Sequence, residues 1–137
     1  MPMQTITLSL PESTFLRFEQ MSKVTHRPLV ELVLRAVEVG SPPGWEEAPA
    51  RFQTDLAALD RLDNQSLWQI AKANRGETEA ARLQELLDRR SDSTISAPEE
   101  QELSVLVEEA DRFMLCKAHA AALLRWRGEI IPPAEQL

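Results

Sequence analysis

The side chains that most often carry chemistry are few and scattered in this sequence. His26 and His119 are far apart, and neither has a partner at the spacing of metal ligands. Cys116, the single cysteine, lies in an apolar stretch, which is typical of a small buried thiol rather than a nucleophile. No carboxylate lies in an apolar setting, and there is no glycine-rich phosphate loop or nucleophile elbow. We therefore expect that the protein is not an enzyme and that it binds neither a cofactor nor a metal ion.

The acidic residues are concentrated in one stretch. The 137 residues include 22 acidic and 15 basic ones, for a net charge of −7. Residues 1–40 carry four of each, whereas residues 77–111 carry eleven acidic and three basic residues. A protein that binds DNA mainly through charge is basic overall. Any DNA contact must therefore be confined to a small surface, and the acidic part needs another explanation.

The composition indicates a helical, cytoplasmic protein. Hydrophobic residues make up 43% of the chain and aromatic residues only 5%, which favours helices packed through small aliphatic side chains. A single cysteine suits a reducing compartment. There is no leader-like N-terminus and no apolar run near the ~18 residues that a membrane span needs.

Residues 4–10, QTITLSL, alternate between apolar and polar side chains, which predicts a strand with one buried face. Pro11 ends the strand, and helical spacing predicts two helices up to Gly40, the second starting near Pro28. A lone strand exposes both edges, and about forty residues rarely bury enough area to fold alone. We therefore expect two copies to pair their strands over a shared core made of Ile6, Leu8, Leu10, Phe18, Val33 and Val37.

The polar face of such a ribbon would point outward. A two-stranded ribbon fits the major groove of B-DNA, and the start of the second helix near Arg27 could offer backbone amides to a phosphate. The candidate DNA-binding residues are Gln4, Thr5, Thr7, Ser9 and Arg27. The alternative is a dimerisation element that never contacts DNA.

The run ITLSLPESTFLRFEQMSKVTHRPLVELVLRAVE resembles the ribbon–helix–helix family of repressors and antitoxins. The shared pattern is a short alternating strand ending in LP, a helix, a turn, and a second helix of ELV…A type. The resemblance implies an intertwined homodimer and a transcriptional repressor. It also implies that Thr5, Thr7 and Ser9 contact bases.

The pattern of apolar residues after residue 40 predicts helices throughout the remainder of the chain. We divide the chain into a ribbon–helix–helix module at 1–40, a linker with a short helix at 41–62, a helical partner-binding region at 63–128 and a loose tail at 129–137. Helices are expected from Trp45 to Asp60, after an N-cap at Asp63, and over 77–90. A capping box at Ser96 and Glu99 should open the longest helix, which runs to about Trp126. The fold class is thus mainly α, with the N-terminal strand and a long C-terminal helix.

Three segments of this half resemble a C-terminal region of small bacterial, especially cyanobacterial, proteins of antitoxin type: LDRLDNQSLWQIA, EAARLQELLDRR and PEEQELSVLVEEADRFMLCKAHAAALLRWRG. The resemblance implies a partner-binding role. An acidic helical surface could occupy the basic cleft of a nuclease in place of its phosphates. The candidate residues are Glu99, Glu100, Glu102, Glu108, Glu109 and Asp111, with Trp126 as an aromatic anchor. The alternative is an ordinary solvated face.

These patterns together predict the antitoxin of a type II toxin–antitoxin pair. It would neutralise a nuclease toxin of the PIN or HNH type and repress its own operon by binding operator DNA as a dimer. The alternative, from another class, is a homodimeric interaction or scaffold protein, or a free-standing repressor without a toxin.

Overall fold

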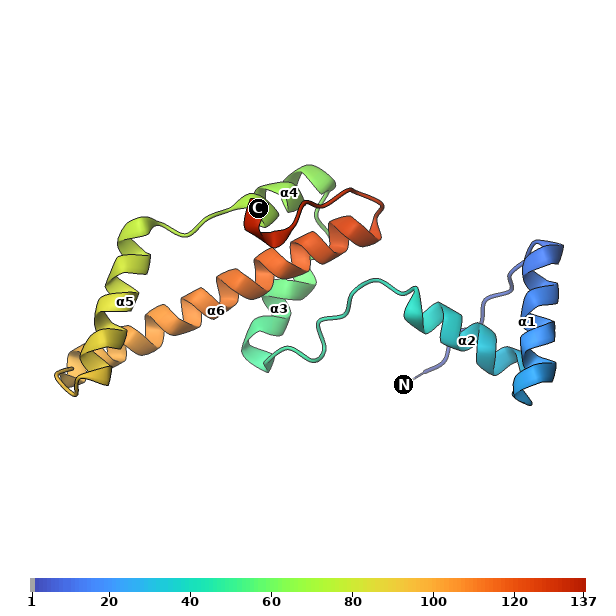
Figure 1. Ribbon diagram of the computed structural model, residues 1–137, viewed down its shortest axis with the longest axis horizontal. Helices are drawn as coiled ribbons and strands as arrows, with labels where there is room; N and C mark the ends of the chain where they lie inside the picture. Colours follow the sequence, from blue (N-terminus) through green and yellow to red (C-terminus); the bar gives the residue numbers. More distant parts are fainter. Residues whose placement is uncertain (1) are drawn as a thin grey trace. The chain divides into compact units, whose positions relative to one another are not determined.

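The computed structural model describes residues 2–137, and the regular structure in this range is entirely helical. Six α-helices are followed by a short 3-10 helix, η1 (Figure 1). They are α1 (Glu12–Thr25), α2 (Leu29–Val39), α3 (Ala50–Leu59), α4 (Asn64–Lys72), α5 (Glu77–Ser91), α6 (Ala97–Trp126) and η1 (Ala134–Gln136). The prediction of a mainly α protein with a long C-terminal helix is confirmed.

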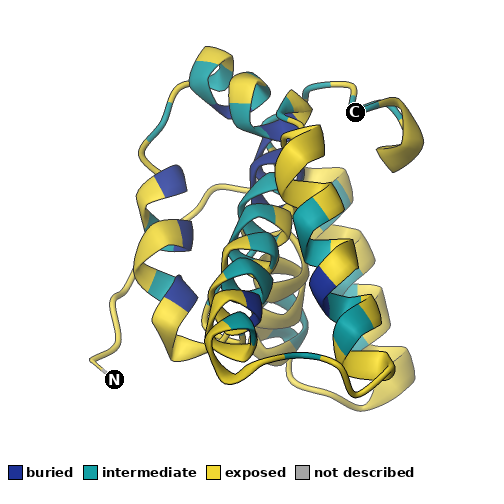
Figure 2. Ribbon diagram, turned by 90° about the vertical axis from the view of Figure 1, so that its left-hand side faces the viewer, coloured by how far each residue is buried: buried dark blue, intermediate teal, exposed yellow. Residues whose placement is uncertain are grey.

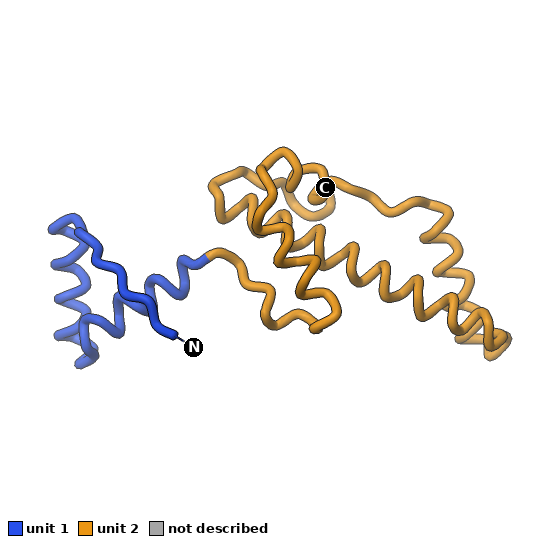
Figure 3. Tube along the Cα trace, turned by 180° about the vertical axis from the view of Figure 1, so that it is seen from behind, with its two compact units in different colours: residues 1–41 blue, residues 42–137 orange. Residues whose placement is uncertain are grey.

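The chain forms two compact units, which Figure 3 distinguishes by colour. Unit 1 comprises residues 1–41 and unit 2 comprises residues 42–137. In unit 1, α1 follows Pro11 and ends at His26, whose left-handed backbone (φ 54°) lets its N–H bond to the carbonyl of Ser22. The hydroxyl of Ser22 donates to the carbonyl of Arg27, which fixes the turn into α2.

The strand expected over residues 4–10 is not formed in the described part of a single chain. These residues run without helix or strand before α1. The physical reason is that a β-strand exists only where its N–H and C=O groups pair with a neighbouring strand, and one copy offers no such neighbour in residues 2–137. The ribbon is therefore not shown by the described residues of one copy.

Unit 2 is organised around α6, against which α3, α4 and α5 all pack. Its main core joins one side of α3 and one side of α4 to the C-terminal half of α6, and Figure 2 shows buried positions where helices face one another. The main buried cluster consists of Leu56, Leu59, Leu67, Ala71, Ala120, Ala121, Leu123 and Leu124. Towards the other end of α6, Leu86 of α5 and Leu103 of α6 are also buried.

Local capping sets where the helices of unit 2 begin. The Asp63 carboxylate accepts a hydrogen bond of 2.8 Å from the amide of Ser66, which starts α4 as predicted. At α6, Ser96 Oγ accepts from the Glu99 amide, and Glu99 Oε1 accepts from the Ser96 amide, so the predicted capping box is confirmed. The helix expected from Trp45 instead begins at Ala50, directly after Pro49.

The C-terminal residues return alongside α6. Ile131 and Leu137 pack against the main core, and the Glu129 carboxylate accepts a hydrogen bond of 3.0 Å from the Asn64 side chain. None of the helices formed by residues 2–137 is long and apolar enough to cross a membrane.

Candidate functional site

Unit 1 has no interior of its own. Among its described residues none is buried, although α1 and α2 contact each other. Of the predicted core residues, Ile6 is 78% exposed, Leu8 58% and Val37 53%. A unit of this size with so many exposed aliphatic side chains lacks the buried area that a stable fold requires. The apolar face of residues 6–10 is thus unpartnered within one copy.

The predicted DNA-binding residues are all exposed: Gln4, Thr5, Thr7, Ser9 and Arg27. Arg27 lies two residues before α2, whose N-cap Pro28 makes no side-chain capping bond. The amides of the first turn are consequently open to an anion, as at other helix N-termini. The surface offers hydroxyls, one amide and one cation, which together suit contacts with a phosphate backbone and with base edges.

Three of the six predicted toxin-binding carboxylates are engaged within unit 2. Glu102 accepts from both ends of the Arg82 guanidinium, at 2.9 Å and 2.7 Å, and this contact lowers the pKa of Glu102 and raises that of Arg82. Glu108 pairs with Arg51 at 3.2 Å.

Glu99, the third, has the most partners. Hydrogen bonds from Ser96 lower the pKa of Glu99, and the nearby cations Arg89 and Arg82 add to the effect. Arg89 also binds Glu85 at 2.9 Å, so these side chains form a network that joins α5 to α6. Glu99 and Glu102 therefore hold α5 and α6 together as well as adding negative charge.

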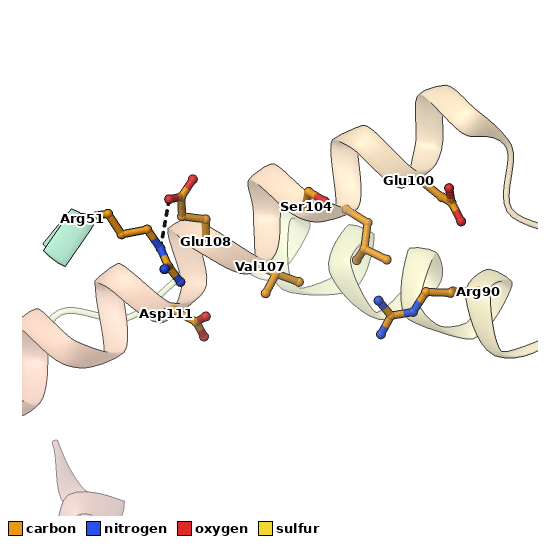
Figure 4. A pocket seen from close by; sticks show the side chains of 8 residues that line it. Arg51, Arg90, Glu100, Ser104, Val107, Glu108 and Asp111 are labelled. Atoms are coloured by element: carbon orange, nitrogen blue, oxygen red, sulfur yellow. Dashed lines mark ion pairs between the residues drawn. The ribbon is translucent and has the colours of Figure 1, made fainter. Parts of the chain in front are cut away.

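The other three carboxylates, Glu100, Glu109 and Asp111, are exposed and make no ion pair with any described residue. Glu100 and Asp111 lie towards opposite ends of a groove of about 470 Å³ (Figure 4), and Leu103 and Val107 are its apolar lining residues. The groove is also lined by Arg51, Arg90, Ser104 and Glu108. The groove thus combines apolar side chains with charges of both signs.

Sequence reasoning missed a polar network at the other end of unit 2. The buried His119 places Nε2 3.0 Å from Asp60 Oδ1, and Asp60 Oδ2 accepts from Trp45 Nε1 at 3.1 Å. Arg127 donates to the carbonyls of Leu62 and Asp60. Trp45 and Asp60 are 15 residues apart in sequence, and the partners of His119 and Arg127 are 59 to 67 residues away, so no local pattern could reveal the network.

Trp126 lies at the end of α6 and is 51% exposed. No group of three or more potential ligands for a metal ion occurs among residues 2–137. Comparison of the chain with protein-family models, with curated proteins and with solved structures gave no match.

Proposed function

We propose that this protein is the antitoxin of a type II toxin–antitoxin pair, acting by stoichiometric binding. Two copies pair through residues 4–10 as a ribbon–helix–helix homodimer that binds operator DNA and represses its own operon. Unit 2 binds and neutralises a nuclease toxin, of the PIN or HNH type. The observation that carries the proposal is the missing interior of unit 1, with Ile6, Leu8 and Leu10 exposed beside an equally exposed polar set.

The pairing of two copies accounts for this exposure. An antiparallel ribbon would satisfy one edge of each strand and bury the apolar residues against four helices. The hydroxyls of Thr5, Thr7 and Ser9 would then face outward from both strands. The ribbon could enter a major groove, with Arg27 and the open amides of α2 near the phosphates.

The DNA-binding part is tested by a mobility-shift titration with the DNA upstream of the protein's own gene. We expect the combined change Thr5→Ala and Thr7→Ala to weaken binding by about tenfold or more, since lost base contacts typically cost ~1–3 kcal/mol. Thr78→Ala, an exposed hydroxyl of unit 2, is the matched control. Unchanged binding by the double variant would remove the ribbon from the DNA interface.

The proposed binding of a toxin by unit 2 rests on the carboxylates that make no ion pair with any described residue. A basic nuclease cleft would attract the acidic surface of α5 and α6 and increase the association rate. Because Glu100, Glu109 and Asp111 have no ion-pair partner within residues 2–137, their charges are available to another protein. Glu99 and Glu102 would contribute mainly by holding α5 on α6.

The test is co-expression with the product of the adjacent reading frame, with toxicity and co-purification as readouts. Reversal of Glu100, Glu109 and Asp111 to lysine should weaken neutralisation at least about tenfold. Reversal of Glu47, Asp92 and Glu135, equally exposed and equal in charge change, is the control. Neutralisation that survives reversal of the first set, or that the control set weakens equally, would contradict the assignment.

The composition of the outward strand residues and the net charge favour a second candidate function. The outward strand residues are short, only Gln4 has a long polar side chain, and the chain carries a net charge of −7. A homodimeric interaction or scaffold protein, or a repressor without a toxin, would fit these features. A dimer that shifts no DNA, encoded beside no toxic gene, would favour the scaffold.

A further inference from the structure

The end of the linker, just before α3, is held on unit 2. Gln53 of α3 donates from Nε2 to the carbonyls of Glu46 and Ala48, in both cases at 2.9 Å. The Ala48 amide donates to the Trp45 carbonyl at 3.1 Å, which closes a turn between them. Trp45 and Ala48 also pack against the main core. Residues 45–49 therefore form a docked segment, which we call the strap.

Asp60, at the end of α3, holds the first residue of the strap. Its Oδ2 accepts a hydrogen bond from Trp45 Nε1 at 3.1 Å, and its Oδ1 lies 3.0 Å from Nε2 of the buried His119 of α6. One carboxylate thus connects an interior histidine to the indole of the strap. The Asp60 side chain is 41% exposed, so water can replace it as the acceptor for the indole when the strap leaves α3. The contact can therefore open without leaving a buried donor unpaired.

The strap determines the length of free chain between the two units. Ser41 is bonded to α2, since its hydroxyl donates to the Val37 carbonyl at 2.6 Å. With the strap docked, residues 42–44 separate Ser41 from it, and three residues span at most about 11 Å. With the strap released, residues 42–49 form the tether, and eight residues span up to about 29 Å. The two prolines of the shorter tether stiffen it further.

We propose that residues 45–49 are a releasable strap and that the hydrogen bond from Trp45 to Asp60 keeps it docked. Docking keeps the tether between the units short, and release lengthens it by the length of the strap. A shorter tether raises the effective concentration of one unit near whatever the other unit binds. The strap therefore regulates how strongly two binding events on the same chain influence each other.

Glu46 and Glu47 of the strap allow its release to be measured by limited proteolysis of the full-length chain. A glutamate-specific protease cleaves after these residues when the strap leaves α3, because proteolysis requires a locally unfolded segment. Glu108 and Glu109, inside α6, report the opening of unit 2 as a whole in the same digest. Mass spectrometry identifies the fragments and measures how fast each appears. The test does not depend on what the two units bind, so it is separate from the tests of the proposed function.

Loss of the hydrogen bond between Trp45 and Asp60 should increase cleavage in the strap alone. Asp60→Ala should raise the rate of cleavage after Glu46 and Glu47 about tenfold, because the indole loses a charged acceptor. Trp45→Phe keeps an aromatic ring against the core and removes only the indole donor, so it should raise the rate about threefold or more. Asp92→Ala, an exposed aspartate after α5, is the matched control and should be cleaved like the wild type.

The Trp45→Phe variant decides the test even where Asp60→Ala lowers the stability of unit 2. Faster cleavage in Trp45→Phe that is confined to the strap supports the proposal. A strap that is cleaved as fast in the wild type as in Trp45→Phe overturns it. So does an increase after Glu46 and Glu47 that cleavage inside α6 matches in both variants, because unit 2 would then open as a whole.

Discussion

Individual ionisable side chains join α5 to α6, and their charge state should control how firmly the two helices hold together. The pKa of Glu102 is lowered by its hydrogen bonds from Arg82, and that of Glu99 by its hydrogen bonds from Ser96 and by its cationic neighbours. A carboxyl whose folded pKa lies below its unfolded value of about 4.3 contributes stability above that value. This contribution is lost as the pH falls through the folded pKa.

We therefore expect the melting temperature to decrease as the pH is lowered from about 5 to about 3. In Glu102→Gln, which cannot ionise, this decrease should be smaller. Far-UV circular dichroism at a series of pH values measures both. Glu109→Gln, which removes a carboxylate without an ion pair in the described chain, should keep the wild-type decrease. An equal decrease in the Glu102 variant and in the wild type would contradict the assigned role of the Arg82–Glu102 pair.

At the scale of elements, the helices were largely predictable and their connections were not. The capping residues Asp63 and Ser96 fixed two helix starts because capping depends on residues only three apart. The apolar spacing extends back to Trp45 and so predicts too early a start for α3. The helix begins at Ala50, directly after Pro49. The strand could be expected from its alternation, but a ladder needs a second chain. Long-range contacts such as Arg127 to the loop before α4 have no local signature.

Arg127 connects the end of α6 by hydrogen bonds to the segment between α3 and α4 and to the start of α4. Its guanidinium donates to Leu62 O at 2.7 Å, to Asn64 Oδ1 at 3.0 Å and to Asp60 O at 3.1 Å. Arg127→Met should lower the free energy of unfolding by about 2 kcal/mol, because partly buried acceptors lose a charged donor. Arg125→Met, two positions earlier and exposed, should change it by less than about 0.5 kcal/mol. Urea unfolding measures the free energy of unfolding of both variants. Equal losses of stability would contradict the stabilising role of the Arg127 hydrogen bonds.

At the scale of the whole molecule, the predicted surfaces divide between the two units. Unit 1 displays the predicted DNA-binding residues and the exposed apolar side chains of residues 6–10, and unit 2 holds the acidic helices. The sequence predicted that residues 4–10 need a second copy, because alternation without a neighbouring strand leaves both polar edges open. It could not separate the acidic residues that pair within unit 2 from those left free, since Arg82 and Glu102 meet only through tertiary packing.

The central claim is that residues 4–10 hold two copies together, and sedimentation equilibrium tests it most directly. The wild-type chain should show twice its mass of 15.5 kDa, and Leu8→Asp should show the single mass because a carboxylate cannot be buried in the shared core. Thr7→Asp, on the outward face, should remain dimeric. A monomeric wild-type protein, or a Leu8→Asp variant as dimeric as Thr7→Asp, would contradict the account.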